Sequence, residues 1–200
     1  MTKILVVEGC FGELAPYARR ILDAFLSSLP ERYGKEYRVE RVDLNTIQLS
    51  PLNEAAFKKR NELLAAKKYS DPAFAYARQF AEADLIVIAA TEYYMNIPAK
   101  LSTYLEHAIC PGIAFVRRGE GSFQSKCEAQ ALVYLAARGM ETQDQWAWQK
   151  TYFEDVAFRL RMGFKMASAN CLYDGSPEGR EYYVKNACSR AKRIAEELNQ

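Results

Sequence analysis

Residues 91–98 carry the side chains best suited to binding a small ring. Two tyrosines, a methionine and an asparagine directly follow the apolar run at residues 85–90. Aromatic and thioether side chains form apolar walls for a flat ring, and an asparagine and loop amides can hydrogen-bond its heteroatoms. The alternative is that Tyr93 and Tyr94 pack against neighbouring helices as amphipathic core residues. The residue types favour a heteroaromatic ligand in this loop.

A second candidate site follows the apolar run at residues 3–7. Two glycines form a turn that leads into a helix near Pro16, and the free N–H groups of a helix N-terminus attract anions. Because no hydroxyl residue stands at the cap, Arg19 or Arg20 would have to supply the charged contacts. The alternative is that both arginines are ordinary exposed helix residues, and Glu13 in the same turn would repel a phosphate.

Several familiar catalytic motifs are missing from the sequence. Neither G-x-x-x-x-G-K-[ST] nor a G-x-G-x-x-G after the first apolar run occurs, which weighs against a P-loop NTPase and a dinucleotide-binding Rossmann domain. Cys10 lacks the following arginine that a phosphatase loop needs, since position 16 is proline, and we interpret it as a small loop residue. His107 is the single histidine, so we expect no metal site and a structural or subunit-contact role for it.

The amino-acid composition is typical of a globular protein with nearly balanced charge. Of 200 residues, 50% are hydrophobic and 26% charged, and the formal net charge is +2. A chain of this size and composition is expected to form a single domain that spans residues 1–200. Its balanced charge gives no reason to expect binding to nucleic acid or to an acidic membrane. The longest apolar run is too short to span a bilayer, and no secretory leader precedes residues 3–7. Five cysteines without C-x-x-C spacing are typical of reduced thiols, which predicts a cytoplasmic protein.

The apolar runs predict an α/β fold. Strands are expected at residues 3–7, 37–42, 85–90, 131–136 and 167–173, and helices at residues 16–29, 54–68, 73–83, 98–110, 149–162 and 178–198. Residues 112–127 are expected to be rich in loops. Alternating strands and helices predict a three-layer, doubly wound parallel sheet, because parallel neighbours need crossover helices. Ligands bind such sheets beyond the carboxyl ends of the strands, which brings together the loops that follow residues 7, 90 and 136.

Six segments of the chain together form a recognisable pattern: Ala83-Asp84-Leu85-Ile86-Val87-Ile88-Ala89-Ala90, Tyr93, Asn96-Ile97-Pro98-Ala99-Lys100-Leu101, Tyr104-Leu105-Glu106-His107, Gly112-Ile113-Ala114-Phe115 and Ala137-Arg138-Gly139-Met140. In these segments the chain resembles a known family, the flavodoxin-like NAD(P)H oxidoreductases, in particular the FMN-dependent NADH azoreductases and related quinone reductases. It implies a flavodoxin-like sheet of five parallel strands in the order 2-1-3-4-5.

The resemblance also implies roles for individual residues. The loop against the isoalloxazine ring would be Glu92, Tyr93, Tyr94 and Met95, shaped by Asn96. The loop on the pyrimidine side would be Ala137, Arg138, Gly139 and Met140, with Arg138 as the charge that stabilises the reduced ring. The FMN phosphate would lie at Cys10, Pro16, Tyr17 and Ala18, with Arg19 as a charged contact.

The activity implied is that of an enzyme, an FMN-dependent NAD(P)H oxidoreductase. Non-covalent FMN would receive hydride at N5 from NADH or NADPH and pass electrons to a quinone, azo compound or nitroaromatic in a ping-pong sequence. No protein acid or base is assigned. The family pattern implies a homodimer, and Trp146 and Trp148 would roof a flat substrate or contact the partner subunit.

The chain departs from the family at the phosphate loop. The family's serines are absent there, Ala137 replaces a hydroxyl residue and Met140 replaces a glycine. Fewer hydrogen bonds to a charged group predict weaker FMN binding. The alternative function is therefore a flavodoxin-like binding or regulatory protein that has lost tight flavin binding.

Overall fold

The computed structural model describes residues 1–29, 37–119, 122–140, 147–173 and 175–198. Its main sheet has five parallel strands in the order β2-β1-β3-β6-β7. Their bounds are β1 Lys3–Gly9, β2 Arg38–Asp43, β3 Leu85–Glu92, β6 Ala131–Arg138 and β7 Gly163–Ala169. Counted along this sheet, the order is the predicted 2-1-3-4-5, so the flavodoxin-like topology is confirmed.

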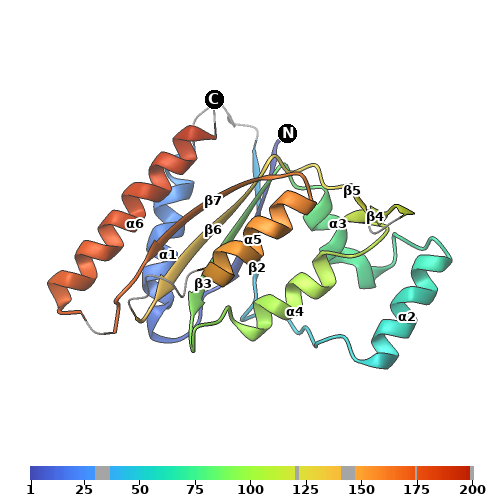
Figure 1. Cartoon of the computed structure of the whole chain (residues 1–200), viewed down its shortest axis with the longest axis horizontal. Coiled ribbons are helices and arrows are strands. Elements are labelled where there is room, and N and C mark those ends of the chain that lie inside the picture. The colour runs from blue at the N-terminus through green and yellow to red at the C-terminus, as the bar shows by residue number, and fades with distance from the viewer. Residues whose placement is uncertain (30–36, 120–121, 141–146, 174, 199–200) are drawn as a thin grey trace.

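Helices cover both faces of the sheet (Figure 1). One face carries α1 (Ala15–Leu26) and α6 (Pro177–Glu197), while α3 (Ala75–Ala81), α4 (Ala99–Ala108) and α5 (Ala147–Arg159) lie on the other. Helix α2 (Glu54–Ala65) stands apart from the sheet and has no fully buried residue, although its Leu63 and Leu64 pack, partly buried, against a small cluster that includes Phe74 and Ala77. Two short 3-10 turns, Gly12–Leu14 and Pro72–Phe74, precede α1 and α3. Within the described ranges, no helix is both long and apolar enough to cross a membrane.

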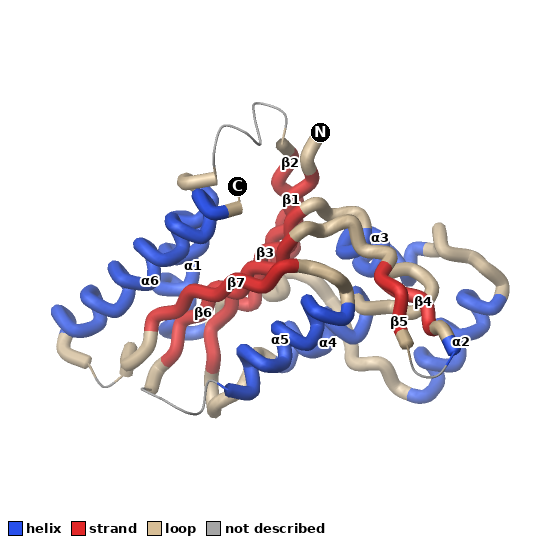
Figure 2. The backbone as a smooth tube through the Cα atoms, turned by 45° about the horizontal axis from the view of Figure 1, so that its top comes forward, coloured by secondary structure: helices blue, strands red, loops and turns tan. Residues whose placement is uncertain are grey.

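The central strands are buried on both faces. Figure 2 shows that the sheet runs between the helical layers. Successive strand side chains point to opposite faces. Val87 and Ala89 therefore join the core beneath α1 and α6, while Ile86 and Ile88 join the core beneath α3, α4 and α5. This two-sided burial explains why the sequence of β3 has no polar alternation.

Several predicted boundaries were wrong, and the first strand, β1, already runs two residues further than expected, to Gly9. Strands β3 and β6 each run two residues further than expected, because their parallel pairing continues to Glu92 opposite Arg138, so these two residues end strands rather than belong to loops. The last strand occupies Gly163–Ala169 instead of residues 167–173, since pairing with β6 forms a strand despite its polar residues. Residues 112–127 contain an antiparallel hairpin, β4 (Phe115–Arg117) and β5 (Phe123–Ser125), which the loop expectation missed.

Candidate active site

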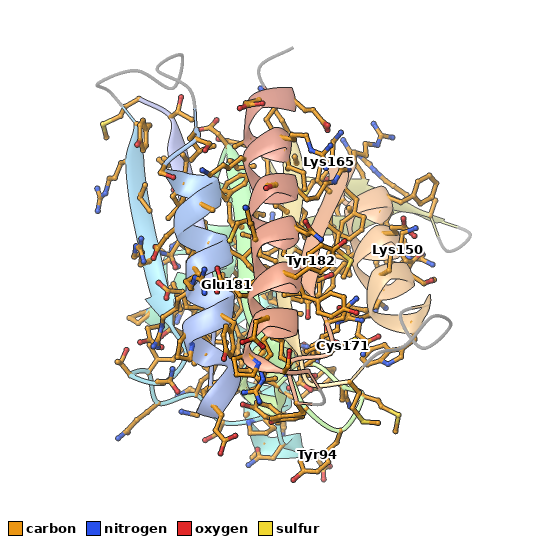
Figure 3. The ribbon with its side chains drawn as sticks, turned by 90° about the vertical axis from the view of Figure 1, so that its left-hand side faces the viewer. Tyr94, Lys150, Lys165, Cys171, Glu181 and Tyr182 are labelled. Atoms are coloured by element: carbon orange, nitrogen blue, oxygen red, sulfur yellow. The ribbon has the colours of Figure 1, made fainter. Side chains whose placement is uncertain are left out.

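A cleft of about 440 Å³ lies at the carboxyl ends of β3 and β6. Figure 3 shows this end of the molecule, where Tyr94 and Cys171 lie, opposite the end that carries Lys165. The residues that line the cleft are mainly apolar or aromatic, with two charged side chains at its floor: Glu92, Tyr93, Tyr94, Met95, Arg138, Gly139, Met140, Gln149 and Tyr173.

One wall of the cleft is a tight turn with unusual backbone geometry. The Asn96 N–H donates to the Tyr93 carbonyl at 2.9 Å, and the two residues between them, Tyr94 and Met95, have φ angles of 51° and 59°. Left-handed conformations cost a residue with a Cβ roughly 1–2 kcal/mol. Such strain persists where surrounding contacts enforce it, and it concentrates at functional sites. The turn leaves Tyr94 96% exposed and Met95 61% exposed at the mouth of the cleft.

The start of α5 holds this turn in place. The indole Nε1 of Trp148 and the amide Nε2 of Gln149 both donate to the carbonyl of Met95, each at 2.9 Å. Gln149 is only 2% exposed and lines the cleft. Because a carbonyl can only accept, these bonds fix the orientation of the Gln149 amide. Helix α5 therefore supports a strained turn that belongs to another part of the chain.

Tyr93 connects two loops across the sheet edge. Its hydroxyl donates to the carbonyl of Phe11 at 2.8 Å and accepts from the N–H of Leu14 at 3.4 Å. Gly12 lies directly beside this hydroxyl with a φ of 62°, so a Cβ there would meet both steric strain and the phenol. The ring of Tyr93 also lies beside that of Tyr173, with their centroids 6.5 Å apart. The expectation that the loops after β1 and β3 meet is confirmed.

The cleft floor contains a buried ion pair between adjacent strands. A guanidinium nitrogen of Arg138, Nη2, donates to Oε1 of Glu92 at 2.7 Å, and the hydroxyl of Tyr134 donates to the same oxygen at 2.6 Å. The side chains of Glu92 and Arg138 are 4% and 6% exposed. Burial raises the pKa of Glu92 above its ordinary value, while Arg138 and Tyr134 favour its charged form. Burial also raises the pKa of Tyr134 well above its ordinary value, which keeps that hydroxyl a donor.

The predicted phosphate site lies outside the cleft lining. Helix α1 begins without a side-chain cap among the described residues, the Ala15 N–H donates to the Gly12 carbonyl, and Pro16 has no N–H to offer. Tyr17 is half-buried and Ala18 is buried against the sheet, while Arg19 is exposed. Arg20, the other suggested anion contact, places its guanidinium on Glu181 of α6 at 2.7 and 2.8 Å, which leaves Arg19 as the candidate charged contact.

Three further candidates also lie outside the cleft lining. The thiol of Cys10 is buried and donates to the Ala89 carbonyl at 3.4 Å, and burial raises its pKa to about 12. Ala137 is fully buried beneath α1 and α6, since its odd register places it on the opposite face from Arg138. The Asn96 side chain accepts a hydrogen bond from the N–H of Ile97 at 2.8 Å, where the turn leads into α4.

Sequence reasoning missed Gln149, Tyr173 and Tyr134. Gln149 and Tyr173 line the cleft from segments whose apolar patterns gave no local sign of a site, and Tyr134 was taken only as part of a buried strand. Trp146 lies outside the described residues, whereas Trp148 supports the Met95 turn. His107 bonds the Ser50 carbonyl at 2.9 Å, in agreement with a structural role.

The sheet order and a ligand-sized cleft at the carboxyl edge define a flavodoxin-like α/β protein. Residues 2–172 match the model of the protein family described as the flavodoxin-like fold, and the chain belongs to that family.

The relatives of this chain include several proteins named FMN-dependent NADH:quinone oxidoreductase. The one from Lachnoclostridium phytofermentans is 30% identical over 146 residues, which cover 70% of this chain and 71% of the relative. The one from Clostridium beijerinckii is 40% identical over 86 residues, which cover 43% of this chain and only 41% of the relative's own length. An FMN-dependent NADH-azoreductase from Bacillus anthracis, solved in complex with FMN, has the same fold over 100% of both chains, with a TM-score of 0.82 and 18% identity.

Proposed function

We propose that this chain is an FMN-dependent NAD(P)H oxidoreductase that reduces small aromatic acceptors such as quinones, azo compounds and nitroaromatics. The observation that carries the proposal is the cleft of about 440 Å³, which combines apolar walls with a charged floor. Its volume lies in the range of small-molecule sites, and it occupies the edge at which doubly wound sheets bind ligands. The relatives named FMN-dependent NADH:quinone oxidoreductases support the same reading.

The residues of the cleft fit the ring of FMN. Tyr93, Tyr94, Met95, Met140 and Tyr173 offer aromatic and thioether surface to a flat tricyclic system. Gly139 leaves room for the ring of Tyr173, which a Cβ at this position would overlap, so the glycine lets Tyr173 form part of the cleft lining. The turn held by α5 is already in place, so it would not have to be ordered when the ring binds.

When bound, FMN would accept hydride from a reduced nicotinamide and return electrons to the acceptor. The protein's part is to position the ring, exclude water from one of its faces and set the charge beside it. Arg138 brings a guanidinium to the cleft floor from the last position of β6. Hydride delivery itself needs no acid or base from the protein.

The mouth of the cleft also suggests a second subunit. Tyr94, Met95, Met140, Trp148 and Tyr173 all expose large apolar side chains around it. Clusters of exposed aromatic and methionine side chains are typical of protein interfaces. A homodimer that covers one side of the mouth would bury them and narrow the opening around a small aromatic acceptor.

The phosphate end fits FMN less well than the ring end. The first turn of α1 lacks hydroxyl residues, and Pro16 removes one backbone donor. Arg19, exposed on α1, is the proposed charged partner for the phosphate. This shortage of donors favours a second candidate function, a flavodoxin-like binding or regulatory protein without tight flavin binding.

An FMN titration of the purified protein separates the two functions. For the enzyme, flavin fluorescence should be quenched on binding, and the visible bands of bound FMN should bleach when NADH is added without air. Met95→Ala should weaken FMN binding by about tenfold, because it removes apolar contact with the ring. The matched control, Phe57→Ala on the remote helix α2, should bind as the wild type does. No quenching at high FMN would leave only the binding or regulatory protein.

A further inference from the structure

Glu92 introduces a negative charge at the floor of the proposed ring site. It is the last residue of β3 and stands directly opposite Arg138, the last residue of β6. Both side chains lie on the α5 face of the sheet, together with Tyr134, because the three positions share one register parity. Both charged side chains line the cleft and are almost fully buried.

The geometry makes the pair a unit. Arg138 and Tyr134 both donate to Oε1 of Glu92, at 2.7 and 2.6 Å. Charge-assisted bonds of this length hold the carboxylate against the guanidinium. Because water is largely excluded here, charges act more strongly on a neighbouring ligand than they would at the surface.

An isolated guanidinium in this position would strongly favour a negatively charged ligand. With Glu92 at 2.7 Å, the ligand instead meets a dipole in which the positive charge of Arg138 is offset. The difference matters for a ring that gains negative charge on two-electron reduction. A site with a bare positive charge binds the reduced form much more tightly than the oxidised form, whereas an offset charge reduces that preference.

We propose that Glu92 is a positioning residue that offsets the charge of Arg138 and so limits the preference of the cleft for reduced over oxidised FMN. This inference rests on the proposed function, since it requires FMN in the cleft. Its chemical consequence is a lower reduction potential of the bound ring, because the potential follows the ratio of the affinities for the two forms. A lower potential favours passing the electrons on to acceptors that are hard to reduce.

The test is the ratio of dissociation constants for oxidised and reduced FMN, obtained from anaerobic titrations and checked by equilibration with a reference dye. Glu92→Gln keeps the shape of the side chain and removes its charge. The variant should bind reduced FMN about tenfold more tightly, relative to oxidised FMN, than the wild type does. For a two-electron couple, tenfold corresponds to about 30 mV.

Two further variants separate charge from shape and folding. Tyr134→Phe removes one bond to Oε1 but leaves both charges, so its ratio should stay within about threefold of the wild type. If Glu92→Gln does not fold because Arg138 is left without its counter-charge, the double variant Glu92→Gln/Arg138→Gln removes both charges together. Its ratio should also stay close to that of the wild type.

The outcomes distinguish the two proposals. If Glu92→Gln has the same ratio of dissociation constants for oxidised and reduced FMN as the wild type, the role of Glu92 is overturned while the proposed function stands. The same conclusion follows if the preference of the double variant for reduced FMN falls tenfold. In the second case Arg138 would be acting as an uncompensated charge. A wild-type protein that binds neither form of FMN overturns the proposed function and this inference together.

Discussion

The thiol of Cys10 illustrates how position within the core decides whether a side chain can react. It follows β1 at the edge where ligands bind, yet it points beneath α1 and donates to the carbonyl of Ala89. A thiol reacts as its thiolate, and burial makes that form costly. The interpretation of Cys10 as a small loop residue rather than a nucleophile therefore agrees with its surroundings.

We expect Cys10 to resist iodoacetamide in the folded protein. With a pKa of about 12, only on the order of one thiol in ten thousand is ionised at pH 8, and the fraction rises only as the pH approaches that pKa. Peptide mass spectrometry after alkylation at pH 8 should find Cys10 unmodified. The control is the same reaction in urea, where Cys10 should be alkylated readily. Rapid labelling in the native state would contradict the buried position.

At the scale of the element, the turn between β3 and α4 is the part of the fold that local sequence preferences do not favour. Turns with two consecutive positive φ angles normally contain asparagine, aspartate or glycine. Tyr94 and Met95 adopt this geometry because the bonds from Trp148 and Gln149 fix the Met95 carbonyl. In this conformation the side chains of Tyr94 and Met95 form one wall of the cleft.

Tyr94→Gly should raise the free energy of unfolding by about 0.5–1 kcal/mol. Glycine relieves the left-handed strain, and the lost side chain is almost fully exposed, although the greater freedom of glycine in the unfolded chain offsets part of the gain. Urea unfolding followed by circular dichroism measures the change. Tyr94→Ala is the matched control, since it keeps a Cβ and so keeps the strain. Equal effects of the two substitutions would show that strain at this position is not being relieved.

On the scale of the whole molecule, one sheet joins two separate cores. Phe25 of α1 belongs to the core on one face and Phe80 of α3 to the core on the other, and both are fully buried. The central strands contribute alternate residues to each core, so neither layer can lose its packing without exposing the strands they share.

Phe25→Ala and Phe80→Ala should therefore each lower the stability of the entire chain, by about 3–5 kcal/mol. Unfolding should remain a single transition when it is followed both by circular dichroism and by tryptophan fluorescence. Phe158→Ala, at a position that is 81% exposed, should change stability by less than about 0.5 kcal/mol. Two separate transitions in either core variant would mean that the layers unfold independently.

The sequence by itself determined the class of fold and the edge of the sheet at which the cleft lies. Fully apolar runs such as residues 85–90 mark strands covered on both faces, and their alternation with helices requires parallel crossovers. These signals are local, so they can be read along the chain. The same holds for the aromatic loop at residues 91–98, whose Tyr93, Tyr94 and Met95 do line the cleft.

Tertiary structure alone decided which distant side chains complete the site. Gln149 and Tyr173 reach the cleft only because α5 and the segment after β7 fold back to the ends of β3 and β6. The pairing of Glu92 with Arg138, 46 positions apart in the sequence, depends on the register between two strands, which no local pattern encodes. Charge compensation and backbone strain are properties of such long-range contacts, and they arise only once the layers have packed.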